Sequence, residues 1–499
     1  MPDILDEIVQ RRREDYRRLG PEFGCAVPPR RTRPLVPFLA VPGTILEVKR
    51  ASPSKGDIAP DLDPVSIVAQ YRAAGTKNVS VLTESNFFKG SLDDLVAVST
   101  GNNELAFLRK DFILYEDELE VSFRAGADAV LLIARILERP LLLKLAAGCR
   151  ALGMTAFIEV RDEDDVRKLE AAALAGTVVA GVNTRDLATF RLDPLVPAAL
   201  RTRLPCKTVF ESGASTPGAC RFAHQLGFEG LLIGEAAARA PEKAGELVAA
   251  FLDARPDWVG QFWREIGRRA AGRTRPLIKI CGLTSLGDAL AACDLGADIL
   301  GFVFAPSPRS ADPVAVRTIS DALAERRRTA GPAAPERPLL VAVIVDPDSI
   351  QAAQAFALVK DGVIDAVQYH GEIPAYDLPR IDAAGGSFGI GRYAVVRLGG
   401  EADLERIDTL IRDGEPRVLV DARVEGIAGG TGKTIPRSLV RKASERCPLW
   451  LAGGINPQNV RAYIDECAPE LIDVSSGLEA MPGRKDHGLM KSFFREVAR

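Results

Sequence analysis

Short apolar runs, often β-branched, alternate along the whole chain with longer stretches rich in Ala and Leu. This alternation is typical of βα units whose strands form a parallel sheet. In the first half of the chain the apolar runs span residues 44–48, 79–82, 105–108, 129–133, 155–158, 178–182, 208–210 and 231–233. In the second half they span residues 277–280, 299–304, 340–345, 366–369, 394–396, 418–420, 449–452 and 471–474.

Each half therefore offers about eight strands, the number that closes a (β/α)8 barrel. One such set could arise by coincidence, but two consecutive sets make a pair of barrels the leading architecture. The pattern predicts an α/β fold class with two consecutive (β/α)8 TIM barrels joined by a helical linker. We expect the first barrel over residues 1–256, the linker helix over 257–275 and the second barrel over 276–499.

Length and composition agree with this organisation. The chain has 499 residues, and a default of roughly 100–200 residues per domain would give about three domains, but barrels reach about 250 residues each. Hydrophobic residues make up 47% and charged residues 26%, ordinary values for a soluble globular protein. The 64 basic and 67 acidic residues leave a formal charge of −3, which argues against a nucleic-acid partner.

Several other classes of protein are not expected. No apolar run approaches the roughly 18 residues that cross a bilayer, so no membrane partner is indicated. The amino-terminal pattern is an amphipathic helix with Ile4, Leu5, Ile8 and Val9 on one face, and it lacks the features of a secretory signal. Eight cysteines without a Cys-x-x-Cys pair, and only three histidines, predict neither a disulfide scaffold nor a metal site. We expect a cytoplasmic monomer.

Ionisable and amide side chains gather where the strands of the first half end. In such barrels the catalytic groups lie at strand ends and in the loops that follow. One lysine at a strand end is usually a solvated loop charge, but so many polar strand ends together favour a functional site. The candidates are Glu47, Lys49, Lys110, Glu159, Asn183, Arg185 and Glu211.

A phosphate site is expected separately in the loops after the seventh and eighth strands. Backbone N–H groups in these loops often hold phosphate, and glycine permits the close approach. Ser212 and Gly213 occupy the first loop, and Gly234 and Glu235 occupy the second. Each glycine alone could be a simple turn, but the pair favours a binding role.

These residues lie in strings that resemble a known family, indole-3-glycerol phosphate synthase, over nearly all of residues 1–255. The strings are ILEVKRASPSKG, VSVLTESNFFKGS, FLRKDFI, GADAVLLIA, VNTRDLATF and VFESG. The resemblance implies decarboxylative ring closure of carboxyphenylamino-deoxyribulose phosphate to indole-3-glycerol phosphate. It implies that Lys110 is the general acid, that Glu159 transfers a proton in the later dehydration, and that Lys49 is the second lysine.

By the same resemblance, other residues line the site. Glu47, Asn183, Arg185 and Glu211 would orient the reacting groups, and Ser52 would join the phosphate region with Ser212, Gly213, Gly234 and Glu235. A lysine acid works best when its pKa is lowered towards the working pH. We expect crowding by Lys49 to lower the pKa of Lys110.

The second half places a thiol and a carboxylate at two strand ends. Cys281 ends the first strand and Asp421 ends the sixth, so the two would face each other across one barrel mouth. A buried cysteine is more often a packing residue, but this pair suits proton abstraction on one side of a sugar carbon and donation on the other. Gly453, Gly454, Ser475, Ser476 and Gly477 follow the seventh and eighth strands and repeat the phosphate arrangement.

One glycine-rich segment imitates a nucleotide-binding loop. Residues 429–434 read GGTGKT, but Ile427 stands where the full Walker A spacing requires glycine. We therefore reject an ATP site and expect a glycine-rich loop after the sixth strand.

Residues 277–499 resemble a second family, phosphoribosylanthranilate isomerase. The strings are IKICGLTS, DILGFVFAPSPRS, AVQYHG, GGTGKT, LAGGINPQNV and DVSSGLEAMPGRKD. The resemblance implies an Amadori rearrangement with Cys281 as general base and Asp421 as general acid. Arg309 would meet the anthranilate carboxylate, and Gln368 and His370 match the fourth-strand motif. The chain departs from the family where Ile435, Pro436 and Arg437 follow the glycine-rich loop.

The sequence thus predicts a bifunctional tryptophan-pathway enzyme whose second barrel makes the substrate of the first. Its partners would be small sugar-phosphate substrates, and no metal or organic cofactor is implied. Two alternatives stay open. The second barrel could be inactive or act on another aminoaldose phosphate, although a histidine-pathway isomerase would be expected to use two aspartates. The chain could instead be a non-catalytic phosphosugar-binding scaffold.

Overall fold

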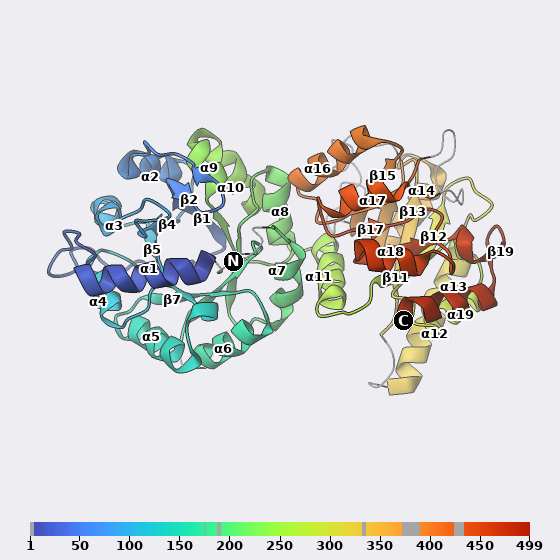
Figure 1. Cartoon of the computed structure of the whole chain (residues 1–499), viewed down its shortest axis with the longest axis horizontal. Helices are drawn as coiled ribbons and strands as arrows, with labels where there is room; N and C mark the ends of the chain where they lie inside the picture. The colour runs from blue at the N-terminus through green and yellow to red at the C-terminus, as the bar shows by residue number, and fades with distance from the viewer. Residues whose placement is uncertain (1–3, 175, 187–190, 332–335, 372–389, 424–433) are drawn as a thin grey trace. The chain divides into compact units, whose positions relative to one another are not determined.

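The computed structural model describes residues 4–499 except 175, 187–190, 332–335, 372–389 and 424–433 (Figure 1). The chain forms two compact units, Met1–Pro256 and Asp257–Arg499. Each unit contains one closed barrel of parallel strands. The prediction of two consecutive (β/α)8 barrels is therefore confirmed.

The barrel of the first unit closes because its first strand pairs with both its last strand and the next barrel strand along the chain. Its strands are β1 (Gly43–Val48), β4 (Asn78–Leu82), β5 (Ala106–Lys110), β6 (Ala129–Ile133), β7 (Thr155–Val160), β8 (Val178–Asn183), β9 (Lys207–Glu211) and β10 (Gly230–Ile233). A short hairpin of β2 (Ala51–Ser52) and β3 (Gly56–Asp57) follows β1.

Helices surround this barrel (Figure 1). They are α1 (Ile4–Leu19), α2 (Pro64–Ala73), α3 (Leu92–Ser99), α4 (Asp117–Arg124), α5 (Arg139–Ala151), α6 (Glu163–Ala173), α7 (Leu195–Leu200), α8 (Pro217–Gln225), α9 (Glu235–Arg239) and α10 (Ala244–Leu252). Short 3₁₀ turns are η1 (Ala134–Ile136), η2 (Arg201–Arg203) and η3 (Pro241–Lys243). Several helices begin at side-chain caps; for example, Asp162 accepts hydrogen bonds from the backbone N–H groups of Asp164 and Asp165.

The segment before β1 runs from one end of the first barrel to the other. Helix α1 lies at the carboxyl end of the strands, where Arg12 donates to Asp111 just after β5. At the amino end, Phe38 packs edge-on against Phe157, and the Leu39 backbone N–H donates to Asn78 at the start of β4. Because Phe38 and Leu39 are buried, this segment closes the bottom of the barrel and leaves the polar strand ends at the top.

The barrel of the second unit closes between β11 and β18. Its strands are β11 (Leu277–Cys281), β12 (Ile299–Phe304), β13 (Leu339–Ile344), β14 (Ala366–Tyr369), β15 (Arg392–Leu398), β16 (Val418–Ala422), β17 (Trp450–Leu451) and β18 (Leu471–Val474). After β18 come η8 (Ser476–Leu478) and a hairpin of β19 (Glu479–Met481) and β20 (Arg484–Lys485). The described helices are α11 (Trp258–Ala270), α12 (Leu286–Asp294), α13 (Pro313–Ala330), α14 (Ile350–Lys360), α16 (Leu404–Arg412), α17 (Arg437–Ser444), α18 (Val460–Cys467) and α19 (His487–Ala498), with η7 (Glu401–Asp403) before α16.

Helix α11 covers part of the expected linker but packs within the second unit. Phe262 stacks on Tyr393 of β15 at a ring separation of 6.1 Å, and Trp263 lies 5.7 Å from Trp450 of β17. Both α11 side chains are almost fully buried. Phe262 and Trp263 therefore form core rather than part of a free connection, while the proposed division at 1–256, 257–275 and 276–499 stays a prediction.

Candidate active sites

Lys110 stands at the centre of the polar cluster in the first barrel. It ends β5, and its Nζ lies 3.1 Å from Oε2 of Glu211 and 3.8 Å from Oε2 of Glu47. Lys49, just after β1, places its Nζ 3.4 Å from the other oxygen of Glu47. The four side chains come from the ends of β1, β5 and β9, so the barrel brings together residues that are far apart in sequence.

The electrostatics of Lys110 differ from the expectation. Burial disfavours its charged form, but the carboxylates of Glu211, Glu47 and Glu159 outweigh burial and raise the pKa of Lys110 above its ordinary value. The prediction that crowding by Lys49 lowers this pKa is wrong. The reason is that three carboxylates act on Lys110, and one of them, Glu47, also pairs with Lys49.

The two carboxylates beside Lys110 respond in opposite directions. Burial among other acids raises the pKa of Glu211 to about 7, although Lys110 opposes the shift. Burial also acts on Glu47, but Lys49 and Lys110 together hold the pKa of Glu47 below its ordinary value. A hydroxyl that the sequence analysis missed, Ser80 of β4, donates to Oε2 of Glu47 at 3.3 Å. Around neutral pH the cluster can therefore both hold and release protons.

Glu159, Asn183 and Arg185 form the adjoining part of the site. The amide of Asn183 donates to Oε1 of Glu159 at 3.5 Å, and the backbone N–H of Arg185 donates to Oδ1 of Asn183 at 2.9 Å. Arg185 is partly buried, which lowers the pKa of its guanidinium. The strand ends β7 and β8 thus fix the carboxylate of Glu159 through one amide.

The expected phosphate residues adopt conformations suited to exposing backbone N–H groups. Ser212 and Gly213 both have positive φ, +68° and +82°, directly after β9. A Cβ on Gly234 would lie 2.6 Å from Oε1 of Glu47, so that carboxylate would have to shift. Ser52 is buried in β2, and the side chain of Glu235 is held by Arg239 one turn along α9.

Sequence reasoning missed a carboxylate that shapes the loop after β4. Glu84 is buried and accepts hydrogen bonds from the backbone N–H groups of Asn86, Phe87 and Phe88. The loop so held places the Phe88 ring 5.7 Å from Nζ of Lys49. The string TESNFF carried the family resemblance, but nothing in it distinguishes a buried glutamate from a solvated one.

A second missed feature is the buried ion-pair network beside Lys110. Asp111 Oδ2 accepts from Arg12 of α1 at 2.7 Å and from Arg109 of β5 at 2.9 Å. Glu118 of α4 lies 3.2 Å from the same Arg12 nitrogen. Burial acts against the charge on Asp111, but the two guanidiniums lower its pKa overall. The network joins α1 to the residue that follows Lys110.

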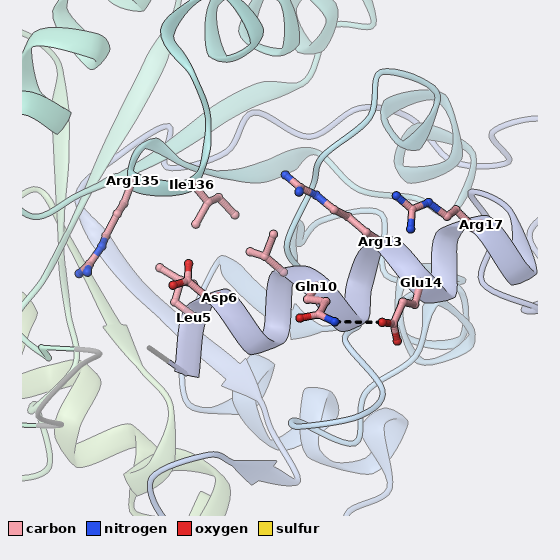
Figure 2. A pocket seen from close by; sticks show the side chains of 9 residues that line it. Leu5, Asp6, Gln10, Arg13, Glu14, Arg17, Arg135 and Ile136 are labelled. Carbon is pink, nitrogen blue, oxygen red and sulfur yellow. Dashed lines mark hydrogen bonds between the residues drawn. The ribbon is translucent and has the colours of Figure 1, made fainter. Parts of the chain in front are cut away.

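A groove of about 610 Å³ lies between α1 and η1. Figure 2 shows Arg13 and Arg17 of α1 beside it, with Arg135 and Ile136 on the opposite wall. Gln10 donates to Glu14 along the same face. None of the residues assigned to the first site lines this groove.

In the second barrel Cys281 ends β11 with its side chain buried. Lys279, two residues earlier, places Nζ 3.5 Å from the Cys281 sulfur and 2.6 Å from Oδ2 of Asp473 in β18. Lys279 also donates to Oε1 of Gln368, which accepts a further bond from the Tyr393 hydroxyl. Sequence reasoning missed Lys279 and Asp473. Their signal was a charged residue at an alternate, inward position of an otherwise apolar strand.

Asp421 and His370 form the other side of this site. His370 Nε2 lies 3.1 Å from Oδ2 of Asp421, and its Nδ1 is 3.0 Å from the amide nitrogen of Gln368. The other oxygen of Asp421 accepts from the backbone N–H of Ala422 at 2.7 Å. The hydrogen bond from Ala422 fixes the carboxylate at the end of β16, with the His370 imidazole beside it.

Arg309, expected to meet a substrate carboxylate, is engaged by a carboxylate of the chain itself. Its guanidinium donates to both oxygens of Glu479 at 2.8–3.1 Å. Lys485 donates to the same Glu479 at 3.0 Å and to the backbone carbonyl of Ser475. Glu479 therefore occupies the position in which a planar anion would bind Arg309.

The expected phosphate loops of this barrel pack closely. Gly453 and Gly454 have positive φ, +92° and +63°. A Cβ on Gly477 would overlap the carbonyl oxygen of Ile455, so the loop after β18 fits against the loop after β17 only with glycine there. Ser475 and Ser476 stand between β18 and this glycine. The glycine-rich loop lies outside the described residues except Thr434, and Ile435 after it is buried.

Among the described residues, no group of three or more histidine, cysteine, aspartate or glutamate side chains is arranged to hold a metal ion. None of the helices within the described ranges has both the length and the apolar character needed to cross a membrane.

Family models match both barrels in order. Residues 34–248 match indole-3-glycerol phosphate synthase, and residues 278–496 match N-(5'-phosphoribosyl)anthranilate isomerase. An indole-3-glycerol phosphate synthase of Desulfosudis oleivorans is 43% identical over 40% of this chain and 75% of that protein. One of Rippkaea orientalis is 36% identical over 50% of this chain and 89% of that protein.

Longer relatives match across both barrels. The multifunctional tryptophan biosynthesis protein of Schizosaccharomyces pombe is 30% identical over 91% of this chain, which spans 59% of that protein. A solved phosphoribosyl anthranilate isomerase of Thermotoga maritima is 34% identical over 45% of this chain and 98% of its own, with a TM-score of 0.37. The chain spans less than two thirds of three multifunctional relatives, 59%, 62% and 63%. The chain belongs to the indole-3-glycerol phosphate synthase family and carries a domain of the phosphoribosylanthranilate isomerase family after it.

Proposed function

We propose that the chain is a bifunctional enzyme of tryptophan biosynthesis. The second barrel would isomerise N-(5-phosphoribosyl)anthranilate to 1-(2-carboxyphenylamino)-1-deoxyribulose 5-phosphate. The first barrel would convert that product to indole-3-glycerol phosphate with loss of carbon dioxide and water. The observation that carries the proposal is Lys110, held at the carboxyl end of the first barrel within reach of Glu47 and Glu211.

In the proposed synthase step, Lys110 acts as the general acid. Its raised pKa keeps it protonated at neutral pH, so it can donate a hydrogen bond to the substrate carbonyl as the aromatic ring attacks. Lys49 then pairs with the substrate carboxylate or serves as the later acid. Glu159, oriented by Asn183, takes up and delivers the proton of the dehydration step.

In the proposed isomerase step, Asp421 protonates the ring oxygen of the aminoaldose as the ring opens. The Cys281 thiolate removes the proton from the adjacent sugar carbon, and the resulting enolamine becomes the ketone. Arg309 exchanges Glu479 for the anthranilate carboxylate, since one guanidinium fork holds one planar anion at a time.

We propose further that the phosphate groups bind at the loops after β9 and β10 in the first barrel and after β17 and β18 in the second. Small sugar phosphates are then the only partners required. We expect a monomer in a reducing cytoplasm, where the eight cysteines stay as free thiols. Light scattering on the purified chain tests the monomer.

Assay of the purified chain with each substrate separately tests the proposal. Both activities should be present, with indole-3-glycerol phosphate as the end product. Synthase activity without isomerase activity would favour the alternative in which the second barrel has another substrate. If the chain turned over neither substrate, the enzyme assignment would be overturned. The remaining alternative would then be a non-catalytic phosphosugar-binding scaffold.

A further inference from the structure

A fully buried lysine lies directly beneath the cysteine of the second barrel. Lys279 and Cys281 alternate with apolar Ile278 and Ile280 in β11, so both point into the barrel. The Lys279 ammonium lies 3.5 Å from the sulfur. A lysine with no exposed side chain is rare unless its charge is paired or used.

The barrel register fixes this lysine in place. Lys279 is the neighbour of Asp473 across the pairing of β11 with β18, and their ion pair is 2.6 Å long. On the far side, Gln368 of β14 accepts from Lys279 and from the hydroxyl of Tyr393 in β15. Three strands besides its own thus hold the ammonium against the sulfur.

Other charges face this site from the surrounding elements. Lys485 of β20 and Arg309 after β12 share Glu479, and across the mouth Asp421 of β16 pairs with His370 after β14. The strand β12 contributes Gly301, whose missing side chain makes room for the Cys281 sulfur. Around the thiol, three cations, Lys279, Lys485 and Arg309, therefore face two carboxylates, Asp473 and Glu479. Asp421 across the mouth adds a third carboxylate, so the position of Lys279 beside the sulfur, rather than the total charge, favours the thiolate.

We propose that Lys279 is a positioning residue whose ammonium group stabilises the thiolate form of Cys281, with Asp473 moderating that effect. The thiolate is the form of cysteine that removes protons and attacks carbon. Burial by itself raises the pKa of the Cys281 thiol, and Lys279 opposes that rise whereas Asp473 adds to it. Overall the pKa of the Cys281 thiol stays above its ordinary value, and Lys279 limits that rise.

The role of Lys279 and Cys281 in catalysis rests on the proposed isomerase function. The effect of Lys279 on the ionisation of Cys281 does not. Its test is the pH dependence of Cys281 alkylation by iodoacetamide in the full chain, measured by mass spectrometry of the Cys281 peptide. Lys279→Met removes the charge and keeps a similar length. We expect the alkylation midpoint to rise by about one pH unit or more, which is about a tenfold loss of thiolate at a given pH below the midpoint.

A second variant separates this role from structural damage. Asp473→Asn removes the counter-charge of Lys279, so the alkylation midpoint should move in the opposite direction, to lower pH. Lys360→Met, at the exposed end of α14, is the matched control and should leave the midpoint unchanged. A general loosening of the barrel would shift the alkylation midpoints of Lys279→Met and Asp473→Asn in the same direction.

The outcomes are distinguishable. An unchanged midpoint in Lys279→Met, or shifts of the same sign in Lys279→Met and Asp473→Asn, overturns the proposal. If Lys279→Met does not fold, the Asp473→Asn variant is sufficient by itself: the proposal is overturned when this variant does not lower the alkylation midpoint. The acid limb of isomerase kcat/KM should follow the alkylation midpoint in each variant. If opposite shifts occur in a chain without isomerase turnover, the positioning role holds and the proposed function fails.

Discussion

At the scale of single residues, the position of a polar residue in its strand decided whether the sequence could identify it as a site residue. Lys110, Glu159 and Glu211 were found because each breaks an apolar run where a strand ends. Lys279 and Asp473 sit inside apolar runs, and only their inward direction in a closed barrel makes them partners. The side on which a strand residue points depends on register, which the sequence does not specify for a strand buried on both faces.

Glu211 gives the first prediction, a pH-dependent stability of the first barrel. Its folded pKa of about 7 lies above the ordinary value of 4.5, so the folded state binds this proton more tightly than the unfolded state. The stability that protonated Glu211 contributes to the folded state is fully present below about pH 4.5. It is lost as pH rises through about 7. From pH 5 to 8, the wild type should lose on the order of 2 kcal/mol of unfolding free energy relative to Glu211→Gln.

Hydrogen exchange of the peptide that contains β9, corrected for the intrinsic effect of pH, measures this difference. The comparison concerns only the change with pH, so any effect of the substitution that does not depend on pH cancels. Parallel stability curves for the two proteins would show that Glu211 ionises near its ordinary pKa.

Gly477 gives a prediction about the second phosphate region. Because a Cβ there would overlap the Ile455 carbonyl, Gly477→Ala should push apart the loops after β17 and β18. Overpacking of this kind costs about 1–3 kcal/mol, so the isomerase KM should rise about tenfold or more. Steady-state kinetics measure the effect, and Gly287→Ala, which meets open space in α12, is the control. An unchanged KM would remove this loop from the binding site.

At the scale of elements, α1 shows where hydrophobic patterning is insufficient. The sequence predicted an apolar face of Ile4, Leu5, Ile8 and Val9, and the helix does bury Leu5 and Ile8. The same buried stripe continues through Arg12 and Asp15. Charged residues count as exposed in any pattern analysis, so their burial depends on partners, such as Asp111, that lie about a hundred residues away.

The Arg12 network predicts that α1 supports the synthase site. Arg12→Met removes one of the two guanidiniums that Asp111 and Glu118 share and leaves Arg109 alone with both buried carboxylates. Breaking a buried pair in this way costs about 3–5 kcal/mol. We expect a loss of that order in the stability of the first unit. Because Asp111 follows Lys110 directly, we also expect about a tenfold lower synthase kcat. Denaturant unfolding and kinetics measure the two effects.

Arg11→Met is the matched control, since the neighbouring Arg11 side chain is 53% exposed; it pairs with the exposed Glu14 and, more loosely at 3.9 Å, with Asp15. It should change stability by less than about 1 kcal/mol and leave both activities unchanged. Equal effects of Arg11→Met and Arg12→Met would contradict a specific role for the buried network.

At the scale of the whole molecule, the regular alternation of apolar runs with helical stretches was sufficient to predict both barrels. Strand limits differed mainly at the polar ends, where β5, β8 and β9 extend to include Lys110, Asn183 and Glu211. The short hairpins and the packing of α11 were not predicted, because they depend on contacts between distant segments rather than on local periodicity. The family strings located most candidate residues, whereas the ion pairs among them required the folded barrel.

The central claim is that the chain carries two separate active sites that act in sequence. The most direct test follows N-(5-phosphoribosyl)anthranilate by chromatography in the presence of wild type, Lys110→Ala or Cys281→Ala. The wild type should form indole-3-glycerol phosphate, and Lys110→Ala should accumulate the carboxyphenylamino-deoxyribulose phosphate. Cys281→Ala should leave the starting compound unchanged yet convert added intermediate at the wild-type rate. Indole-3-glycerol phosphate formed by Lys110→Ala at the wild-type rate, or both activities lost in either variant, would contradict the account.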